Sequence, residues 1–220
     1  INGMIYIRGN QQDYDNWAAG GNKGWGWQDV LPYFKKSEKN ETYGDAPEHG
    51  SSGPLNVTYI DKPNPVLGSF LDAIETFQHQ RISDFNTGTQ EGFGLYQVTQ
   101  KNGRRHSTAA AFLKPARDRN NLTIITDAMV SKVRIEKGVA TGISYQQKVQ
   151  KKLLIATKEV MLSAGAIISP KILLHSGIGP AAELKALGIQ TKLDLPGVGK
   201  NLQDHANAVI QHKAKSRALY

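Results

Sequence analysis

The chain has 220 residues, 39% hydrophobic content, a formal net charge of +8 and no cysteine. That length can form one large domain or two small ones around an apolar core. The lack of cysteine excludes disulfides and thiolate metal sites within the chain, and it leaves the redox compartment undetermined, with the cytoplasm as the default. Because the Lys and Arg residues are scattered along the chain, the positive charge does not point to nucleic acid as a partner.

Membrane insertion and secretion are not indicated either. No run of about 18 apolar residues predicts a membrane helix, and no charged start followed by an apolar segment predicts a signal peptide. Association with a membrane surface stays open. The chain begins at Ile1 without an initiator methionine, and 208–213 reads as the start of a strand that has no partner before Tyr220. We therefore expect an internal fragment of a longer protein.

The first half of the chain predicts short helices and strands separated by polar loops. Apolar residues three and four apart predict helices, and alternating apolar residues predict strands. Aromatic residues near the helix junctions are interpreted as core. The expected elements, in chain order, are a helix at 29–37, a strand at 54–59, a helix at 64–77, a strand at 92–100 and a short helix at 108–113.

The next section is rich in β-branched and apolar residues and predicts a β-meander. Lys137 and Gly138 provide the turn between its two longest strands. The expected strands lie at 121–126, 129–136, 139–146 and 153–156.

A strand, a glycine turn and a short helix follow the meander. Residues 159–164 have no polar face and predict a buried strand. Ser169 is then the expected N-cap, Pro170 the first helical residue, and Gly177 the residue that ends the helix. The residues around Gly165 are small enough for a cofactor to approach the backbone. From the residues alone, an ordinary crossover of an α/β domain is the favoured interpretation, because lone glycine motifs often mislead.

Three stretches resemble one known family. Gly165–Gly179 looks like the second signature of the glucose-methanol-choline (GMC) oxidoreductases, flavoenzymes that oxidise alcohols, and Asn2–Gly9 resembles the end of the first signature. Gly197–His205 is similar to a further family segment. The resemblance implies an α/β, FAD-binding, two-domain GMC-type fold, which is α+β within the fragment. It would contain part of the nucleotide-binding domain, a β-meander and part of the substrate domain.

The same resemblance implies a division of the chain into four parts. These are 1–50, part of the FAD-binding domain with a covering loop; 51–115, the start of the substrate domain and the return; 116–205, FAD-binding domain with the meander and second signature; and 206–220, the start of a truncated substrate domain.

By resemblance, FAD is the expected cofactor. Ile1 stands where some members carry a histidine bonded covalently to the flavin, so the FAD is expected to be non-covalent. From the residues alone, a buried helix capped by Asn2 is the preferred interpretation of the first segment, and Val130 is equally consistent with an ordinary strand residue. The positions that the resemblance places against the cofactor are Asn2, Gly3, Met4, Ile5, Val130, Ala164 and Gly165.

The implied activity is oxidation of a primary alcohol, choline or an aliphatic alcohol, to the aldehyde by hydride transfer to flavin. We assign no catalytic and no metal-binding residue, because none of the 6 histidines stands in a context that matches the family's catalytic histidine. The fragment alone is therefore expected to have little or no turnover. The alternatives are another FAD-binding oxidoreductase and a non-enzymatic α/β binding module.

The partners implied by the resemblance are a small-molecule alcohol and an electron acceptor such as a quinone or the respiratory chain. Nucleic acid is not among them. The expected location is cytoplasmic, with peripheral association at the inner membrane left open.

Overall fold

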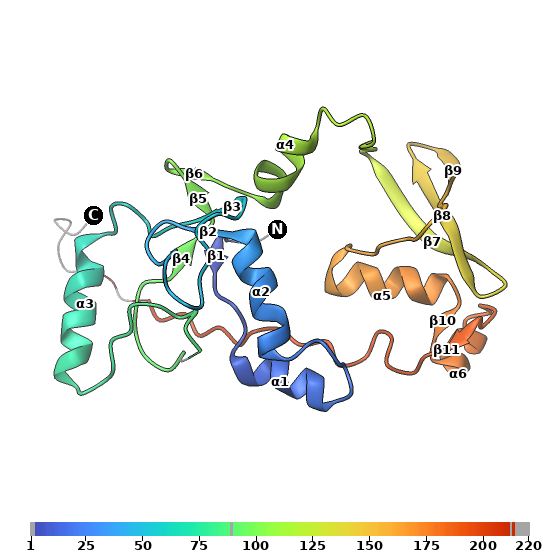
Figure 1. Ribbon diagram of the computed structural model, residues 1–220. Coiled ribbons are helices and arrows are strands. Elements are labelled where there is room, and N and C mark those ends of the chain that lie inside the picture. The colour runs from blue at the N-terminus through green and yellow to red at the C-terminus, as the bar shows by residue number, and fades with distance from the viewer. Residues whose placement is uncertain (1–2, 89, 212, 214–220) are drawn as a thin grey trace. The chain divides into compact units, whose positions relative to one another are not determined.

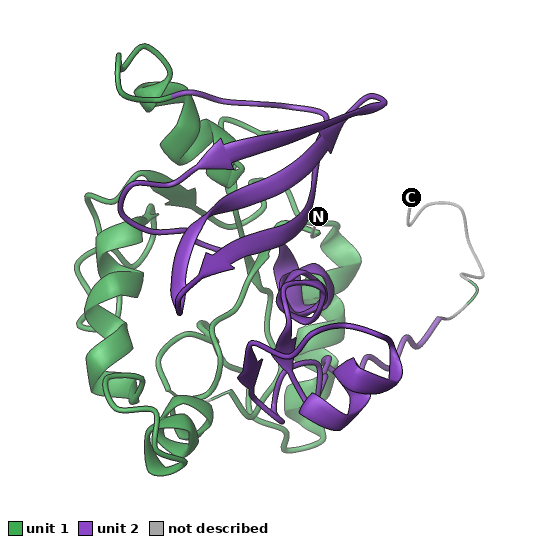
Figure 2. Cartoon of the chain, turned by 90° about the vertical axis from the view of Figure 1, so that its right-hand side faces the viewer, with its two compact units in different colours: residues 1–122, 212–220 green, residues 123–211 purple. Residues whose placement is uncertain are grey.

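The computed structural model describes residues 3–88, 90–211 and 213 (Figure 1). The chain forms two compact units (Figure 2), unit 1 with residues 1–122 and 212–220 and unit 2 with residues 123–211. Among the residues described, no helix has the length and apolar character needed to cross a membrane. The four-part division made from the sequence concerns the domains of a whole enzyme and stays a prediction.

Unit 1 is built from helices joined by short strand pairs. The strands pair β1 with β4 and β5 with β6 in antiparallel fashion, and β2 with β3 in parallel. Its elements are β1 (Ile5–Tyr6), α1 (Gln11–Ala19), α2 (Trp27–Ser37), β2 (Glu38–Asn40), β3 (Leu55–Val57), α3 (Pro65–Thr76), β4 (Gln97–Val98), β5 (Gln100–Lys101), β6 (Arg104–Arg105), a π-helical turn (Ala109–Leu113) and α4 (Lys114–Ala116).

An aromatic cluster holds α1 against α2. The ring of Tyr14 lies 5.7 Å from the rings of Trp27 and Phe34, and Trp27 is buried. Such ring pairs add stability beyond the apolar area that they bury. The interpretation of the aromatic residues in this region as core is confirmed for Trp27, but it is wrong for Trp17 and Trp25, which are about half exposed. The sequence reasoning missed α1 itself, although Asn10 and Asp13 form a capping box at its start.

The predicted amphipathic helix is α3. It begins where expected, because the side chain of Asn64 accepts a hydrogen bond from the N–H of Val66, and its buried side chains are Leu71 and Ile74. The strand expected at 92–100 is interrupted: Phe93 forms only an isolated bridge with Arg81, and named strands begin at β4. The alternative of a capped helix at the start of the chain is wrong, because β1 is a strand that pairs with β4.

Unit 2 contains the predicted meander, a sheet with the order β7-β8-β9. Helix α5 packs on β7, and Val133, Tyr145 and Ile172 are buried there. Strand β9 is an edge of this sheet, and its Leu153, Leu154 and Ile155 are about half exposed. The elements of unit 2 are β7 (Ala128–Glu136), β8 (Val139–Gln147), β9 (Gln150–Ile155), α5 (Gly165–His175), β10 (Ile178–Gly179), α6 (Ala181–Ala186) and β11 (Leu193–Asp194), with β10 and β11 parallel.

Two of the expected strands are wrong. Residues 121–126 and 159–164 belong to no strand, and no ladder partner pairs with either within the part of the chain that the structure describes. The apolar run predicted a buried strand at 159–164, yet Met161 is 80% exposed. A strand needs a hydrogen-bonded neighbour as well as an apolar sequence, and here that neighbour is missing.

The start of α5 also differs from the prediction. The helix begins at Gly165, so Ser169 and Pro170 lie inside it and Ser169 is not the N-cap. The hydroxyl oxygen of Ser169 instead accepts the N–H of Ala164 at 2.9 Å, which secures the first turn from within. The expected end is confirmed, because Gly177 follows the C-cap with a φ of 85°.

Gly177 should resist substitution. A Cβ at this position would overlap the backbone oxygen of Gln190, and a positive φ alone costs a side chain about 1–3 kcal/mol. Gly177→Ala should therefore lower the free energy of unfolding by more than about 1 kcal/mol in urea denaturation.

The matched control is Gly68→Ala within α3. No atom lies within 4 Å of a Cβ at Gly68, so this variant should gain about 0.5–1 kcal/mol from helix propensity. Equal stability of the two alanine variants would contradict the role given to the turn at Gly177.

Candidate functional site

The first candidate segment is the backbone around β1 in unit 1. The carbonyl of Met4 accepts the N–H of Thr99 at 2.8 Å, and Ile5 pairs with Val98 across the β1–β4 ladder. Met4 has a φ of 70°, a conformation that non-glycine residues rarely adopt away from functional or tightly held positions. The side chain of Ile5 is about half exposed. Gly3 to Ile5 are therefore both firmly held and accessible.

Gly3 adds open space to this segment, because no atom lies within 4 Å of where its Cβ would be. A flat or phosphate-bearing ligand could approach the backbone there. Asn2, the first of the predicted cofactor positions, lies outside the described residues. Cofactor contact at Gly3, Met4 and Ile5 stays a prediction.

The second candidate segment is the start of α5 in unit 2. Ala164 and Gly165 are exposed, Gly165 has a φ of 89°, and no atom lies within 4 Å of a Cβ at that glycine. The first amides of a helix lack partners inside the helix and carry partial positive charge, which suits a phosphate. The N–H of Ala164 is already donated to Ser169, so amides later in the first turn are the free donors.

Val130 lies in β7, directly opposite Tyr145 of β8. The ladder is irregular just after Val130, and the N–H of Val133 is donated to the hydroxyl of Ser176 at 2.8 Å. The same hydroxyl donates a hydrogen bond to the carbonyl of Ile172. The strand that carries Val130 is therefore tied to the end of α5.

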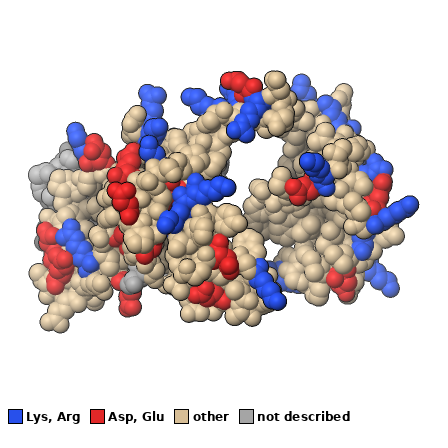
Figure 3. Space-filling model, viewed as in Figure 1, with Lys and Arg blue, Asp and Glu red and all other residues tan. Residues whose placement is uncertain are grey.

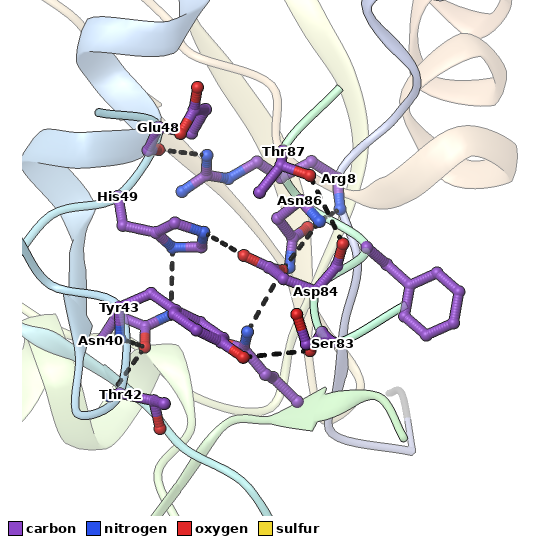
Figure 4. Close-up of polar contacts among 12 residues, drawn as sticks. Arg8, Asn40, Thr42, Tyr43, Glu48, His49, Ser83, Asp84, Asn86 and Thr87 are labelled. Carbon is purple, nitrogen blue, oxygen red and sulfur yellow. Dashed lines mark hydrogen bonds and ion pairs between the residues drawn. The ribbon is translucent and has the colours of Figure 1, made fainter. Parts of the chain in front are cut away.

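Unit 1 contains a buried cluster of charged and amide side chains, part of which Figure 4 shows, and we call it the His49 network. Nε2 of His49 lies 2.7 Å from Oδ2 of Asp84, and its Nδ1 lies 3.0 Å from Oε1 of Glu38. The guanidinium of Arg8 donates a hydrogen bond to the carboxylate of Glu38 at 2.7 Å. Its members, all buried, are Arg8, Glu38, Asn40, His49, Asp84, Asn86 and Gln97.

The sequence reasoning missed this network. His49 stands in a stretch that was expected to be a polar loop, and a buried charge inside a loop leaves no periodic signal. The one local signal is Asp84 itself, because aspartate in a loop often accepts the backbone N–H two residues on. Here it accepts the N–H of Asn86.

The electrostatics of the network follow from its pairing. Burial alone would lower the pKa of His49, but hydrogen bonds to Asp84 and Glu38, with their negative charges, outweigh it and raise that pKa from 6.5 to about 9. Burial acts to raise the pKa of both carboxyls, but hydrogen bonds from His49 and neighbouring amides lower it below the usual value in each. His49 is thus an imidazolium between two carboxylates.

Other titratable groups offer less. Asp204 accepts the N–H of its neighbour His205 at 2.8 Å, so its carboxylate is engaged by the adjacent backbone. In the ranges 3–88 and 90–211 no group of three His, Asp or Glu residues is placed to hold a metal ion. Positive and negative side chains are interspersed over the visible face in Figure 3, so no single positive patch dominates that face.

Comparison with known proteins identifies what these segments belong to. Residues 1–207 match the family described as GMC oxidoreductase. The chain belongs to the GMC oxidoreductase family. The resemblance seen in the sequence is therefore confirmed.

Two curated GMC relatives match the whole chain. An oxygen-dependent choline dehydrogenase from Sinorhizobium fredii (strain NBRC 101917 / NGR234) is 44% identical over 100% of this chain and 40% of the relative. An alcohol dehydrogenase [acceptor] from Pseudomonas putida is 45% identical over 99% of this chain and 40% of the relative. The chain thus spans about 40% of the length of these relatives.

Solved structures confirm the α/β fold of GMC type. Pyridoxine 4-oxidase from Mesorbium loti superposes with a TM-score of 0.84 at 33% identity, over 93% of this chain and 40% of that one. An FAD-dependent oxidoreductase from Chaetomium thermophilum gives a TM-score of 0.84 at 34% identity, over 93% and 38%.

The pairing of His49 predicts how stability changes with pH. Since the pKa of His49 is raised on folding, its contribution to the free energy of unfolding is fully present below about pH 6.5 and is lost as the pH rises through about 9. The lowered pKa values of Glu38 and Asp84 give a contribution to the free energy of unfolding that is lost only on acidification. Urea denaturation should show His49→Gln to be less stable by about 3–5 kcal/mol at pH 6, with the gap narrowing towards pH 9.

The control for this pH series is His205→Gln, which alters an exposed histidine. Its stability should follow the parent at every pH. A gap between parent and His49→Gln that stays constant from pH 6 to pH 9 would contradict the charged state assigned to His49.

Proposed function

We propose that this chain forms part of an FAD-dependent alcohol dehydrogenase that oxidises a primary alcohol, choline or an aliphatic alcohol, to the aldehyde. The observation that carries the proposal is the match of the entire chain to two enzymes named for choline and alcohol oxidation, at 44% and 45% identity. Because the chain covers only 40% of each relative, the substrate of the whole enzyme is itself part of the proposal. Bound FAD supplies the hydride acceptor for such a reaction.

The described residues fit FAD in two respects. Gly3 and Gly165 both leave the space beside the backbone open, and each adjoins a segment that hydrogen bonds hold in place. The first turn of α5 offers amide donors to a phosphate group. We assign cofactor contacts to Gly3 to Ile5, Val130, Ala164 and Gly165, with Asn2 as the neighbouring position in the sequence.

The FAD is proposed to be non-covalent. Ile1, which occupies the position of the flavin-linked histidine in some members, has no nucleophilic atom in its side chain. An acid-precipitated sample of the protein should accordingly release its flavin into the supernatant.

The 220-residue chain by itself is proposed to turn over little alcohol. Abstraction of a hydroxyl proton needs a base that reaches the substrate and is free to accept a proton. His49 cannot act in this way, because it is buried and both ring nitrogens face carboxylates. The remaining histidines stand in no matching context, so we assign no catalytic residue within this chain.

Anaerobic reduction of the flavin tests the proposed reaction. In the full-length parent enzyme purified with bound FAD, either choline or a medium-chain primary alcohol should bleach the visible absorbance of the flavin, and the effective alcohol names the substrate class. The hydrocarbon of the same chain length is the control and should leave the spectrum unchanged. Bound flavin that neither alcohol bleaches would overturn the activity and leave the fold standing.

A further inference from the structure

One connection from the His49 network to β1 runs through the carboxylate of Asp84. One oxygen of this group faces Nε2 of His49 at 2.7 Å. The other accepts the N–H of Asn86 at 2.9 Å and the side-chain amide of Gln97 at 3.2 Å. Figure 4 shows Asp84 between the imidazole and Asn86. Asp84 therefore connects the charged histidine to the backbone of Asn86 and to the side chain of Gln97.

Both of these amide residues hold β1. The side-chain oxygen of Asn86 accepts the backbone N–H of Arg8 at 2.8 Å, and its Nδ2 is donated to the carbonyl of Tyr6 at 3.3 Å. Gln97 pairs with Tyr6 across the β1–β4 ladder. The backbone N–H of Arg8 and the carbonyl of Tyr6 thus depend on the side chain of Asn86, a residue that Asp84 holds by its backbone N–H.

The opposite side of the network fixes the same segment. The Arg8 guanidinium donates hydrogen bonds to the carboxylate of Glu38 at 2.7 Å and to the backbone carbonyl of Glu48 at 2.6 Å. Glu38 also faces Nδ1 of His49 and accepts the N–H of Gly50. Arg8 is held at its backbone by Asn86 and at its side chain by Glu38, and His49 lies between the two carboxylates that support these contacts.

The charges in this cluster balance. Arg8 and His49 are positive, Glu38 and Asp84 are negative, and none of the four is more than 7% exposed. In such surroundings the removal of one charge leaves its partner buried and uncompensated, which strongly destabilises the local arrangement. Buried pairs with several hydrogen bonds also have fixed geometry, which is what a cofactor-binding backbone needs from its support.

We propose that His49 and Asp84 are positioning residues, which act through Asn86 and Gln97 to fix the backbone of Gly3 to Ile5 where it meets the flavin. This inference rests on the proposed function, because it takes FAD as the occupant. It goes beyond that function in giving a cofactor-related role to residues that touch no cofactor themselves. The loop at 48–50 and the turn at 84–86 become the support of the flavin-facing strand.

The test compares variants purified with FAD, read by the visible circular dichroism of the bound flavin and by the FAD dissociation constant. His49→Gln and Asn86→Ala should both change the flavin dichroism and weaken FAD binding by about tenfold or more, the equivalent of one good hydrogen bond. Asn86→Ala leaves every charge in place, so it keeps the test decisive if His49→Gln does not fold.

Two further variants complete the test. Asp84→Asn replaces one accepting oxygen by an NH2 group that cannot accept from its neighbours, and it removes a buried charge, so it should change the flavin dichroism as His49→Gln does. Leu71→Ala removes a buried side chain of α3 in the same unit and should cost about 2–5 kcal/mol of stability with the flavin signal unchanged.

Two outcomes would overturn the inference. One is a parent-like flavin spectrum and FAD affinity in folded His49→Gln and Asn86→Ala, and the other is an equal change in Leu71→Ala. A parent protein that binds no FAD would instead refute the proposed function, and the inference with it, so the two failures are distinguishable.

Discussion

The pairing of buried charges around His49 is the interaction on which unit 1 depends. A lone imidazolium in this setting would be costly to bury, and so would either lone carboxylate. Placed together with Arg8, they cancel and supply one another with hydrogen bonds. Segments that are far apart in the sequence, at 8, 38, 49 and 84, are joined in this way without a large sheet or a long helix.

Unit 2 is organised by a different principle. There the stability comes from apolar packing of α5 on the meander, with Val133, Tyr145 and Ile172 at the contact. Polar groups serve as connectors: Ser176 joins the end of α5 to β7 through one hydroxyl that both accepts and donates. The contrast explains why one unit can be sensitive to pH at its centre while the other has no comparable buried charge among its described residues.

Much of this architecture could be predicted from local signals, and the failures have common causes. The turn at Lys137–Gly138, the cap at Asn64 and the end of α5 at Gly177 are each specified within a few residues, and the structure has them. The strand expected at 159–164 failed because strand formation depends on a neighbour that a local pattern cannot reveal. The His49 network was missed because its members come from loops and from strands of two or three residues, where only the folded chain shows that they are buried.

Strand β9 gives the meander an unprotected edge. Its sequence ends in Leu153, Leu154 and Ile155, and it borders the sheet with a row of backbone groups that can pair with another chain. Lys151 and Lys152 precede the apolar residues, and charges in that position oppose strand-to-strand association between molecules. The two lysines thus act as gatekeepers against aggregation. Because salt screens their charges, this protection is weakest at high ionic strength and is most needed at high protein concentration.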